Sequence, residues 1–234
     1  MSPLTTLGLG LVLGLKHAFD SDHLIAVSSI VARERSPWRS LWIGLFWGLG
    51  HTLTLLVIGL LVLELDIRIP TPVELSFECA VGVVLIGLGL TTLYDCRRRQ
   101  VHVHPHEHGN AAHVHFHAHA ESAAHSHAHP LQLGARPFLV GMVHGLAGSA
   151  ALMLLVLTAV PSTALGLMYL MIFGCGSILG MGAVSLLMGV VFSFATDRLH
   201  EMSRVLRLTV GSVSAAFGAW IVIDIGFVRG LFLG

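Results

Sequence analysis

The sequence predicts an all-α integral membrane protein with six transmembrane helices, arranged as two inverted three-helix repeats. Of its 234 residues, 54% are hydrophobic and only 11% are charged, whereas soluble domains carry roughly 25% charged residues. Six apolar stretches reach the length of about 20 residues that a helix needs to cross a bilayer. Short motifs of the first half recur in the same order in the second half. These observations exclude an ordinary soluble enzyme.

The predicted spans differ in length. The first, second and fifth are long enough to tilt or to break, although length alone sets no tilt angle. Prolines stand near several span ends, where a missing backbone N–H costs least. The six spans are residues 4–31, 38–65, 73–95, 137–160, 163–194 and 205–228.

The arginines predict the orientation, because loops rich in Lys and Arg stay in the cytoplasm. Ten arginines lie in the loops on one side: Arg33, Arg35, Arg39, Arg97, Arg98, Arg99, Arg136, Arg198, Arg204 and Arg207. Only Arg68 and Arg229 lie on the other side. We therefore expect a multi-pass protein of the cell (plasma or inner) membrane, with both termini outside and the loop after the third span in the cytoplasm.

The recurring motifs predict a duplicated three-helix unit. The matching pairs are Gly14–Phe19 with Gly141–Leu146, Phe46–His51 with Ile172–Ser177, and Val81–Val84 with Val210–Val213. Three crossings reverse the chain direction, so the second unit must be inverted, an arrangement typical of transporters with a site between the repeats. The expected domains are residues 1–96, a loop over 97–136, and residues 137–234.

The first span carries the most unusual chemistry, in the string His17–His23 (HAFDSDH). A charged group at the centre of a membrane helix costs roughly 2.5–3.5 kcal/mol on insertion scales. A bound divalent cation would offset this cost, and neutral imidazoles with carboxylates suit nickel, cobalt, copper or zinc. The structural alternative is that these groups pair among themselves and with Lys16.

Helical periodicity leaves the ligand carboxylate open. At 100° per residue, Asp20 lies between His17 and His23 on one helix face. Asp22 points elsewhere unless the helix unwinds locally, as helices at transporter sites commonly do. Either aspartate, or both, could therefore complete the site.

Further polar residues lie in the other spans. His51 follows Gly48 and Gly50 in the second span and is a candidate third imidazole; its alternative is a histidine bonded between helices. In the second half, His144 could be a ligand, a gate or a packing residue. Ser149 and Ser177 could add hydroxyl groups.

The loop after the third span is a low-complexity H-x-H tract. Such tracts bind transition metals weakly and at many points. We expect a disordered cytoplasmic loop that contacts metal rather than a strand, because it has little apolar mass to bury. Its histidines are His102, His104, His106, His108, His113, His115, His117, His119, His125, His127 and His129.

Other acidic residues receive simpler interpretations. Asp95 and Asp224 end the third and sixth spans at matching positions, and capping or pairing with arginine is the expected role. Glu64, Asp66, Glu74 and Glu78 crowd the outer loop between the second and third spans, which is either solvated or attracts cations.

The motifs resemble those of a known family. Lys16–Leu24 (KHAFDSDHL) resembles the H-x-x-x-x-D-H signature of the nickel/cobalt transporter (NiCoT) superfamily, with His17, Asp22 and His23 at the matching positions. Phe46–Thr52 resembles the next motif, which ends in G-H-S/T. The string HGLAGSA from His144 resembles the shorter six-span, urease-accessory (UreH-type) branch.

The resemblance implies a permease for Ni²⁺, or for Co²⁺, and associates this branch with nickel supply to urease. Ni²⁺ uptake is the leading hypothesis, efflux through the same fold is the alternative, and an intramembrane metal-dependent enzyme is a remote one. The expected partners are a divalent transition-metal ion, the lipid bilayer and cytoplasmic nickel acceptor proteins. No resident cofactor and no nucleic acid are expected, since the metal is cargo and the formal net charge is zero.

Overall fold

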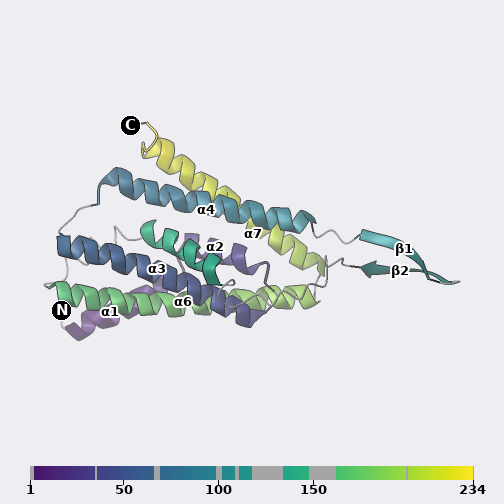
Figure 1. Cartoon of the computed structure of the whole chain (residues 1–234), viewed down its shortest axis with the longest axis horizontal. Coiled ribbons are helices and arrows are strands. Elements are labelled where there is room, and N and C mark those ends of the chain that lie inside the picture. The colour runs from purple at the N-terminus through teal and green to yellow at the C-terminus, as the bar shows by residue number, and fades with distance from the viewer. Residues whose placement is uncertain are drawn as a thin grey trace.

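The computed structural model describes residues 3–34, 36–65, 69–98, 102–108, 111–117, 134–147, 162–198 and 200–233. Within them the chain forms a helical bundle with a small β-hairpin at one end (Figure 1). The elements are α1 (Pro3–His17), α2 (Ser21–Val31), α3 (Pro37–Leu65), α4 (Thr71–Arg98), β1 (His102–His108), β2 (Ala111–His117), a helix over 134–147, α6 (Thr163–Arg198), α7 (His200–Ile223) and the π-helix η1 (Asp224–Val228).

Four helices are long and apolar enough to cross a membrane, and they coincide with four predicted spans. They are Pro37–Leu65, Thr71–Arg97, Thr163–Ala195 and Ser203–Val228. The first predicted span is divided into α1 and α2, of 15 and 11 residues. The fourth is described only as far as residue 147. The architecture of a multi-pass, helical membrane protein is confirmed at this level.

The helices pack in two long pairs. α3 lies along α6, and α4 lies along α7, while α1 packs on α6 and α2 contacts α4, α6 and α7. Both chain termini lie at one end of the bundle, and the hairpin lies at the other (Figure 1). Because α2 contacts all four long helices, α3 included, its first turn is held inside the bundle, where the polar string from the first span is placed.

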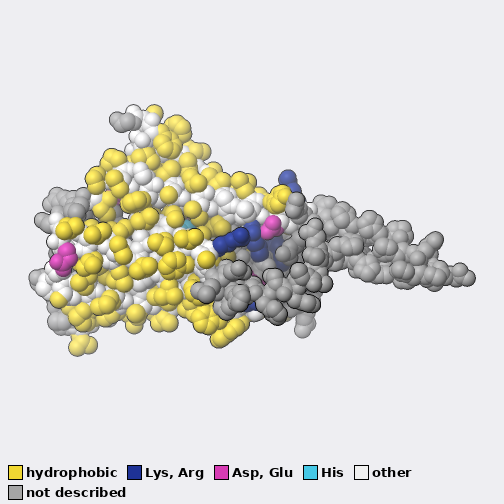
Figure 2. Space-filling view, in the orientation of Figure 1, with side chains coloured by type: hydrophobic (Ala, Val, Ile, Leu, Met, Phe, Trp, Pro, Cys, Tyr) yellow, Lys and Arg dark blue, Asp and Glu magenta, His cyan; other side chains and the backbone are white. Residues whose placement is uncertain are grey.

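The surface and the interior have the polarity expected of a membrane protein. Hydrophobic side chains cover the visible face of the bundle, and Lys and Arg gather near the hairpin end (Figure 2). Exposed apolar residues such as Leu53, Leu61 and Leu187 suit contact with lipid tails. Polar residues, including His51 and Ser177, are fully buried.

The histidine-rich tract was expected to lack strands, and this expectation is wrong for residues 102–108 and 111–117. These residues pair as an antiparallel hairpin in which His102 faces His117, His104 faces His115 and His106 faces His113. Backbone pairing between the two strands, rather than apolar content, accounts for the strands here. His119, His125, His127 and His129 lie outside the described residues.

A candidate metal site at a helix break

The first span breaks just after its first histidine. His17 ends α1, and Asp20 is the N-cap of α2 with extended backbone angles (φ −62°, ψ 147°). Two tight backbone bonds close the turn, from Phe19 N to Lys16 O (2.9 Å) and from Asp20 N to His17 O (3.1 Å). The Asp20 side chain makes no capping bond to α2, so its carboxylate is available to another partner. The local unwinding that would bring both aspartates near the histidines is present.

Three imidazoles converge at this break. The potential ligand atoms of His17, His23 and His51 all lie within 4.8 Å of one another. Nε2 of His17 is 3.1 Å from Nε2 of His51. The ring of His23 lies 4.6 Å from that of His17 and 5.2 Å from that of His51, measured between centroids. The three rings come from α1, α2 and α3, so the fold brings together the three histidines proposed from the sequence.

The two aspartates contact different histidines. Oδ2 of Asp20 lies 2.7 Å from Nδ1 of His17, and Oδ1 of Asp22 lies 3.7 Å from Nδ1 of His23. A carboxylate on one ring nitrogen of a histidine fixes its tautomer and orients the other nitrogen toward a metal. Asp20 therefore leaves Nε2 of His17 as an acceptor that faces the other two rings.

Several buried nitrogens of the cluster lack hydrogen-bond partners. Among the described residues, no hydrogen-bond partner is found for Nδ1 of His23, Nε2 of His23 or Nδ1 of His51. The two residues are 3% and 0% exposed. A buried polar atom without a partner costs free energy, and such atoms in a native protein call for an explanation such as a bound ion. The chemistry of these donors fits a transition-metal cation.

His144, in the helix over 134–147, extends the cluster from the second half of the chain. Its ring centroid is 5.6 Å from that of His23 and 5.3 Å from that of Trp47. Its Nδ1 lies 3.0 Å from the carbonyl oxygen of Val140. Its Nε2 is buried and has no hydrogen-bond partner in the described part of the chain.

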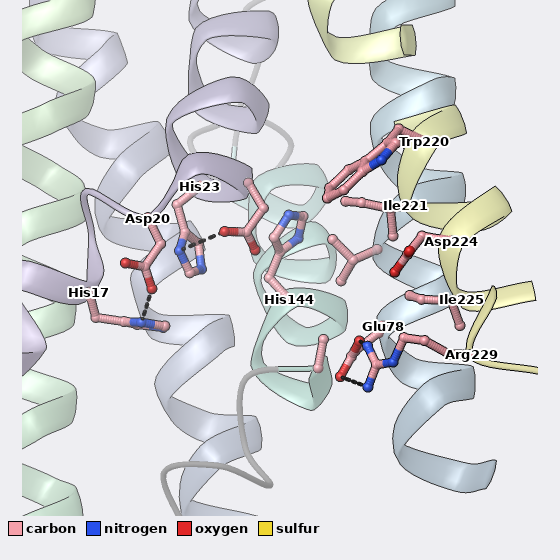
Figure 3. Close-up of a pocket in the computed structure, with 13 residues that line it drawn as sticks. His17, Asp20, His23, Glu78, His144, Trp220, Ile221, Asp224, Ile225 and Arg229 are labelled. Atoms are coloured by element: carbon pink, nitrogen blue, oxygen red, sulfur yellow. Dashed lines mark hydrogen bonds and ion pairs between the residues drawn. The ribbon is translucent and has the colours of Figure 1, made fainter. Parts of the chain in front are cut away.

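A pocket of about 300 Å³ lies beside the cluster (Figure 3). One wall carries His17, His23 and both aspartates, and His144 lines it from the second half. The opposite wall carries residues that the sequence analysis did not assign to the site. They are Glu78 and Val81 of α4, Trp220 and Ile221 of α7, Asp224 and Ile225 of η1, and Arg229.

Two acidic residues that the sequence analysis placed at a span end or in the outer acidic region, Asp224 and Glu78, line the pocket. Glu78 lies within α4 and forms an ion pair with Arg229, and Asp224 lines the pocket. The matching Asp95 pairs with Arg33 at 3.0 Å, as expected. A signal for Asp224 was available, because a carboxylate between Ile223 and Ile225 in an apolar span is expensive unless it serves a site.

The two serines proposed as extra donors have different outcomes. Oγ of Ser177 lies 3.4 Å from the carbonyl oxygen of Gly14, so this hydroxyl joins α6 to α1. It does not line the pocket described above. Ser149 lies outside the residues that the structure describes.

The chain is similar to the urease accessory protein UreH of Bacillus sp. (strain TB-90). The two sequences are 34% identical over 229 residues, which cover 98% of this chain and 95% of the relative. No family model matches the chain, and no solved structure matches it. The matched region therefore extends over nearly the whole length of both proteins.

Proposed function

The chain belongs to the UreH family of urease accessory proteins, and from this premise we propose that it transports Ni²⁺ across the membrane. The resemblance to the urease-accessory branch is thereby confirmed. The observation that carries the transport proposal is the buried set of His17, His23 and His51 at a break in the first span. Broken helices supply the substrate sites of many secondary transporters.

The spacing of the nitrogens supports a single shared ion. Two nitrogens bound at about 2.1 Å to one ion, with an angle of roughly 90–110° between them, lie roughly 3.0–3.4 Å apart. The 3.1 Å between Nε2 of His17 and Nε2 of His51 falls within this range. Imidazole-rich sites suit Ni²⁺, Co²⁺, Cu²⁺ or Zn²⁺ and disfavour Mg²⁺ and Ca²⁺. The urease-accessory relative favours Ni²⁺ among these, with Co²⁺ as a second cargo.

Glycine contacts support the inverted repeat that alternating access requires. A Cβ atom on Gly14 would collide with the Phe173 carbonyl, and one on Gly141 would collide with the Trp47 carbonyl. The motif offsets of 126–127 residues relate Gly14 to Gly141 and Trp47 to Phe173, so each contact is the counterpart of the other.

A second set of contacts follows the same exchange. A Cβ on Gly82 would meet the carbonyl of Gly218, and a Cβ on Gly89 would meet that of Gly211. At the offset of 129 residues, Gly82 corresponds to Gly211 and Gly89 to Gly218. Exchanging the halves converts one contact into the other, as a pseudo-two-fold axis would. Close approach at small residues is the usual packing of membrane helices.

We propose uptake as the direction. A doubly charged ion gains about 4.6 kcal/mol per 100 mV on moving to a negative interior, from about 2.3 kcal/mol per charge. The arginine distribution favours a cytoplasmic location for the end of the bundle that carries the hairpin. Figure 2 shows Lys and Arg gathered near that end. The termini would then face outward.

The test is accumulation of ⁶³Ni²⁺ in cells that express the wild type or His23→Ala. We expect the wild type to raise intracellular ⁶³Ni²⁺ above an empty-vector control and His23→Ala to match that control. Cys175→Ser is the matched control variant, because Cys175 is exposed on α6; it should retain uptake. Excess unlabelled Co²⁺ should compete more strongly than Mg²⁺.

Two outcomes would contradict this proposal. Accumulation below the vector control, lost in His23→Ala, would reverse the direction to efflux. Accumulation that is equal in the wild type and His23→Ala would mean that the histidine cluster does not carry the ion.

The two aspartates should differ in their effect on binding. Asp20→Asn should weaken Ni²⁺ binding by about 10–100-fold, the usual cost of losing an outer partner of a metal-bound histidine. Asp22→Asn should weaken binding less, because Asp22 acts on the ion through His23 and lies farther from that ring (3.7 Å) than Asp20 lies from His17 (2.7 Å). Equilibrium dialysis of the purified protein with ⁶³Ni²⁺ measures both. A larger loss in Asp22→Asn would identify Asp22 as the direct ligand.

A further inference from the structure

The pocket beside the histidine cluster continues to a second group of charged residues. Its far wall is formed by α4, α7 and η1, where Glu78, Asp224 and Arg229 lie together (Figure 3). This group comes from different elements than the imidazoles. The lining therefore extends from the buried ligands toward the end of the bundle that carries the termini.

The lining has an excess of negative charge. It includes four carboxylates, of Asp20, Asp22, Glu78 and Asp224, and one guanidinium, of Arg229. The formal net charge is minus three when the histidines are neutral. A cleft lined by one sign of charge with apolar walls concentrates ions of the opposite sign and raises their association rate.

A buried imidazole stands between the two groups. His144 is 1% exposed, and its Nε2 has no hydrogen-bond partner among the described residues. In Figure 3 the His144 ring lies between His23 and Asp224. The carboxylate of Asp224 points from η1 into the pocket. A cation that leaves Asp224 would meet His144 before the three-histidine cluster.

The ion pair of Glu78 with Arg229 lies at the outer edge of this lining. The C-terminal turn fixes Arg229 there, because Arg229 N bonds to Asp224 O (2.8 Å) and Phe232 N bonds to Gly226 O (2.9 Å). Gly230 permits the reversal with its φ of +83°. The guanidinium is held against Glu78 by a chain reversal that begins at the pocket residue Asp224.

We propose that this lining is the access route of the divalent cation and that the Glu78–Arg229 ion pair is its outer gate. Inside this gate, Asp224 is the first ligand and His144 the second, before the ion reaches His17, His23 and His51. The arriving cation takes the place of the Arg229 guanidinium at the Glu78 carboxylate. This inference rests on the proposed function and adds the path, the gate and the order of contacts to it.

A different result is expected if the Glu78–Arg229 ion pair has only a structural role. A surface ion pair contributes about 0–1 kcal/mol to stability, and its removal would leave the kinetics of metal binding unchanged. A gate controls how fast the ion enters and leaves, with little effect on the equilibrium at the inner site. The rates therefore separate the two roles.

The experiment is stopped-flow quenching of tryptophan fluorescence by NiCl₂, with the purified full-length protein in lipid nanodiscs. Trp47 is buried, and its ring lies 5.6 Å from that of His23. Asp224→Asn should slow association about tenfold, within the range of 10–10³ for electrostatic guidance. Arg229→Gln should speed association and dissociation together, with the dissociation constant changed by less than about threefold. Arg229→Lys, which keeps the charge, should lie between Arg229→Gln and the wild type.

Glu74→Gln is the matched control, because Glu74 lies one turn before Glu78 on α4 and does not line the pocket; its rates should equal those of the wild type. Wild-type rates in both Asp224→Asn and Arg229→Gln, with quenching still lost in His23→Ala, would overturn the gate and leave the inner site intact. No quenching in the wild type would overturn the proposed function itself. Circular dichroism of each variant establishes that it is folded.

Discussion

His51→Ala is expected to weaken Ni²⁺ binding by more than about 100-fold, which exceeds the 10–100-fold typical of losing an outer partner of a ligand. Its Nε2 lies 3.1 Å from Nε2 of His17, and its side chain is fully buried. Of the three clustered imidazoles, it is the only one supplied by α3. Without it, the ion loses one of three neutral donors. Isothermal titration calorimetry of the detergent-solubilised protein with NiCl₂ measures the change.

His144→Ala is the matched comparison, because it also removes a fully buried imidazole. His144 lies outside the group of ligand atoms that are mutually within 4.8 Å, so we expect a loss of about tenfold or less. His51→Gln preserves most of the side-chain volume and separates loss of the ligand from loss of packing. If His51→Ala bound Ni²⁺ as tightly as the wild type while His144→Ala did not, the ligand set would have to be redrawn around His144.

The convergence of the histidines could be predicted from the sequence because its signal is local. Two histidines and two aspartates within seven residues of an apolar span carry a large free-energy cost of membrane insertion unless they bind a common ligand. The span was also long enough to break, and the break occurs between His17 and Asp20. His51 follows two glycines, and both approach other backbones closely: Gly48 faces Ile178, and Gly50 faces Phe138.

The opposite wall of the pocket could not be predicted in this way, because it depends on long-range packing. Glu78 and Arg229 are 151 residues apart and meet only because α4 lies along α7. Asp224 alone carried a signal, as a carboxylate between two isoleucines, but its position at a span end made capping or pairing the ordinary expectation. The π-helix at residues 224–228 changes the direction of the side chains there. π-helical turns are rare and frequent at functional sites, and apolar periodicity carries no signal for them.

The hairpin in the histidine-rich tract shows a limit of composition as a guide. Low apolar content argued against a packed core, but it does not exclude strands. Among the described residues, β1 and β2 pair only with each other. The strict alternation of histidine was the relevant signal for a strand. Whether the histidines of this tract contact metal stays a prediction, as does their cytoplasmic location.

Gly14→Ala and Gly141→Ala should each reduce stability by about 1–3 kcal/mol, the usual cost of overpacking a close contact. The added methyl group at residue 14 would collide with the backbone of Phe173, and that at residue 141 with the backbone and ring of Trp47. Backbone cannot move aside as a flexible side chain can, so the helices must separate. The thermal unfolding midpoint of the purified protein in detergent measures the loss.

These two substitutions should also impair metal binding, because each glycine lies three residues before a site histidine. Separation of α1 from α6 would shift His17, whereas separation of the helix over 134–147 from α3 would shift His144. Gly14→Ala should therefore weaken equilibrium Ni²⁺ binding more than Gly141→Ala at similar stability. Gly8→Ala and Gly87→Ala are the controls, since a Cβ atom at either position meets nothing within 4 Å and alanine favours helix by up to about 1 kcal/mol. If Gly14→Ala were as stable as Gly8→Ala, the close contact of α1 with α6, and the position of His17 that it sets, would be wrong.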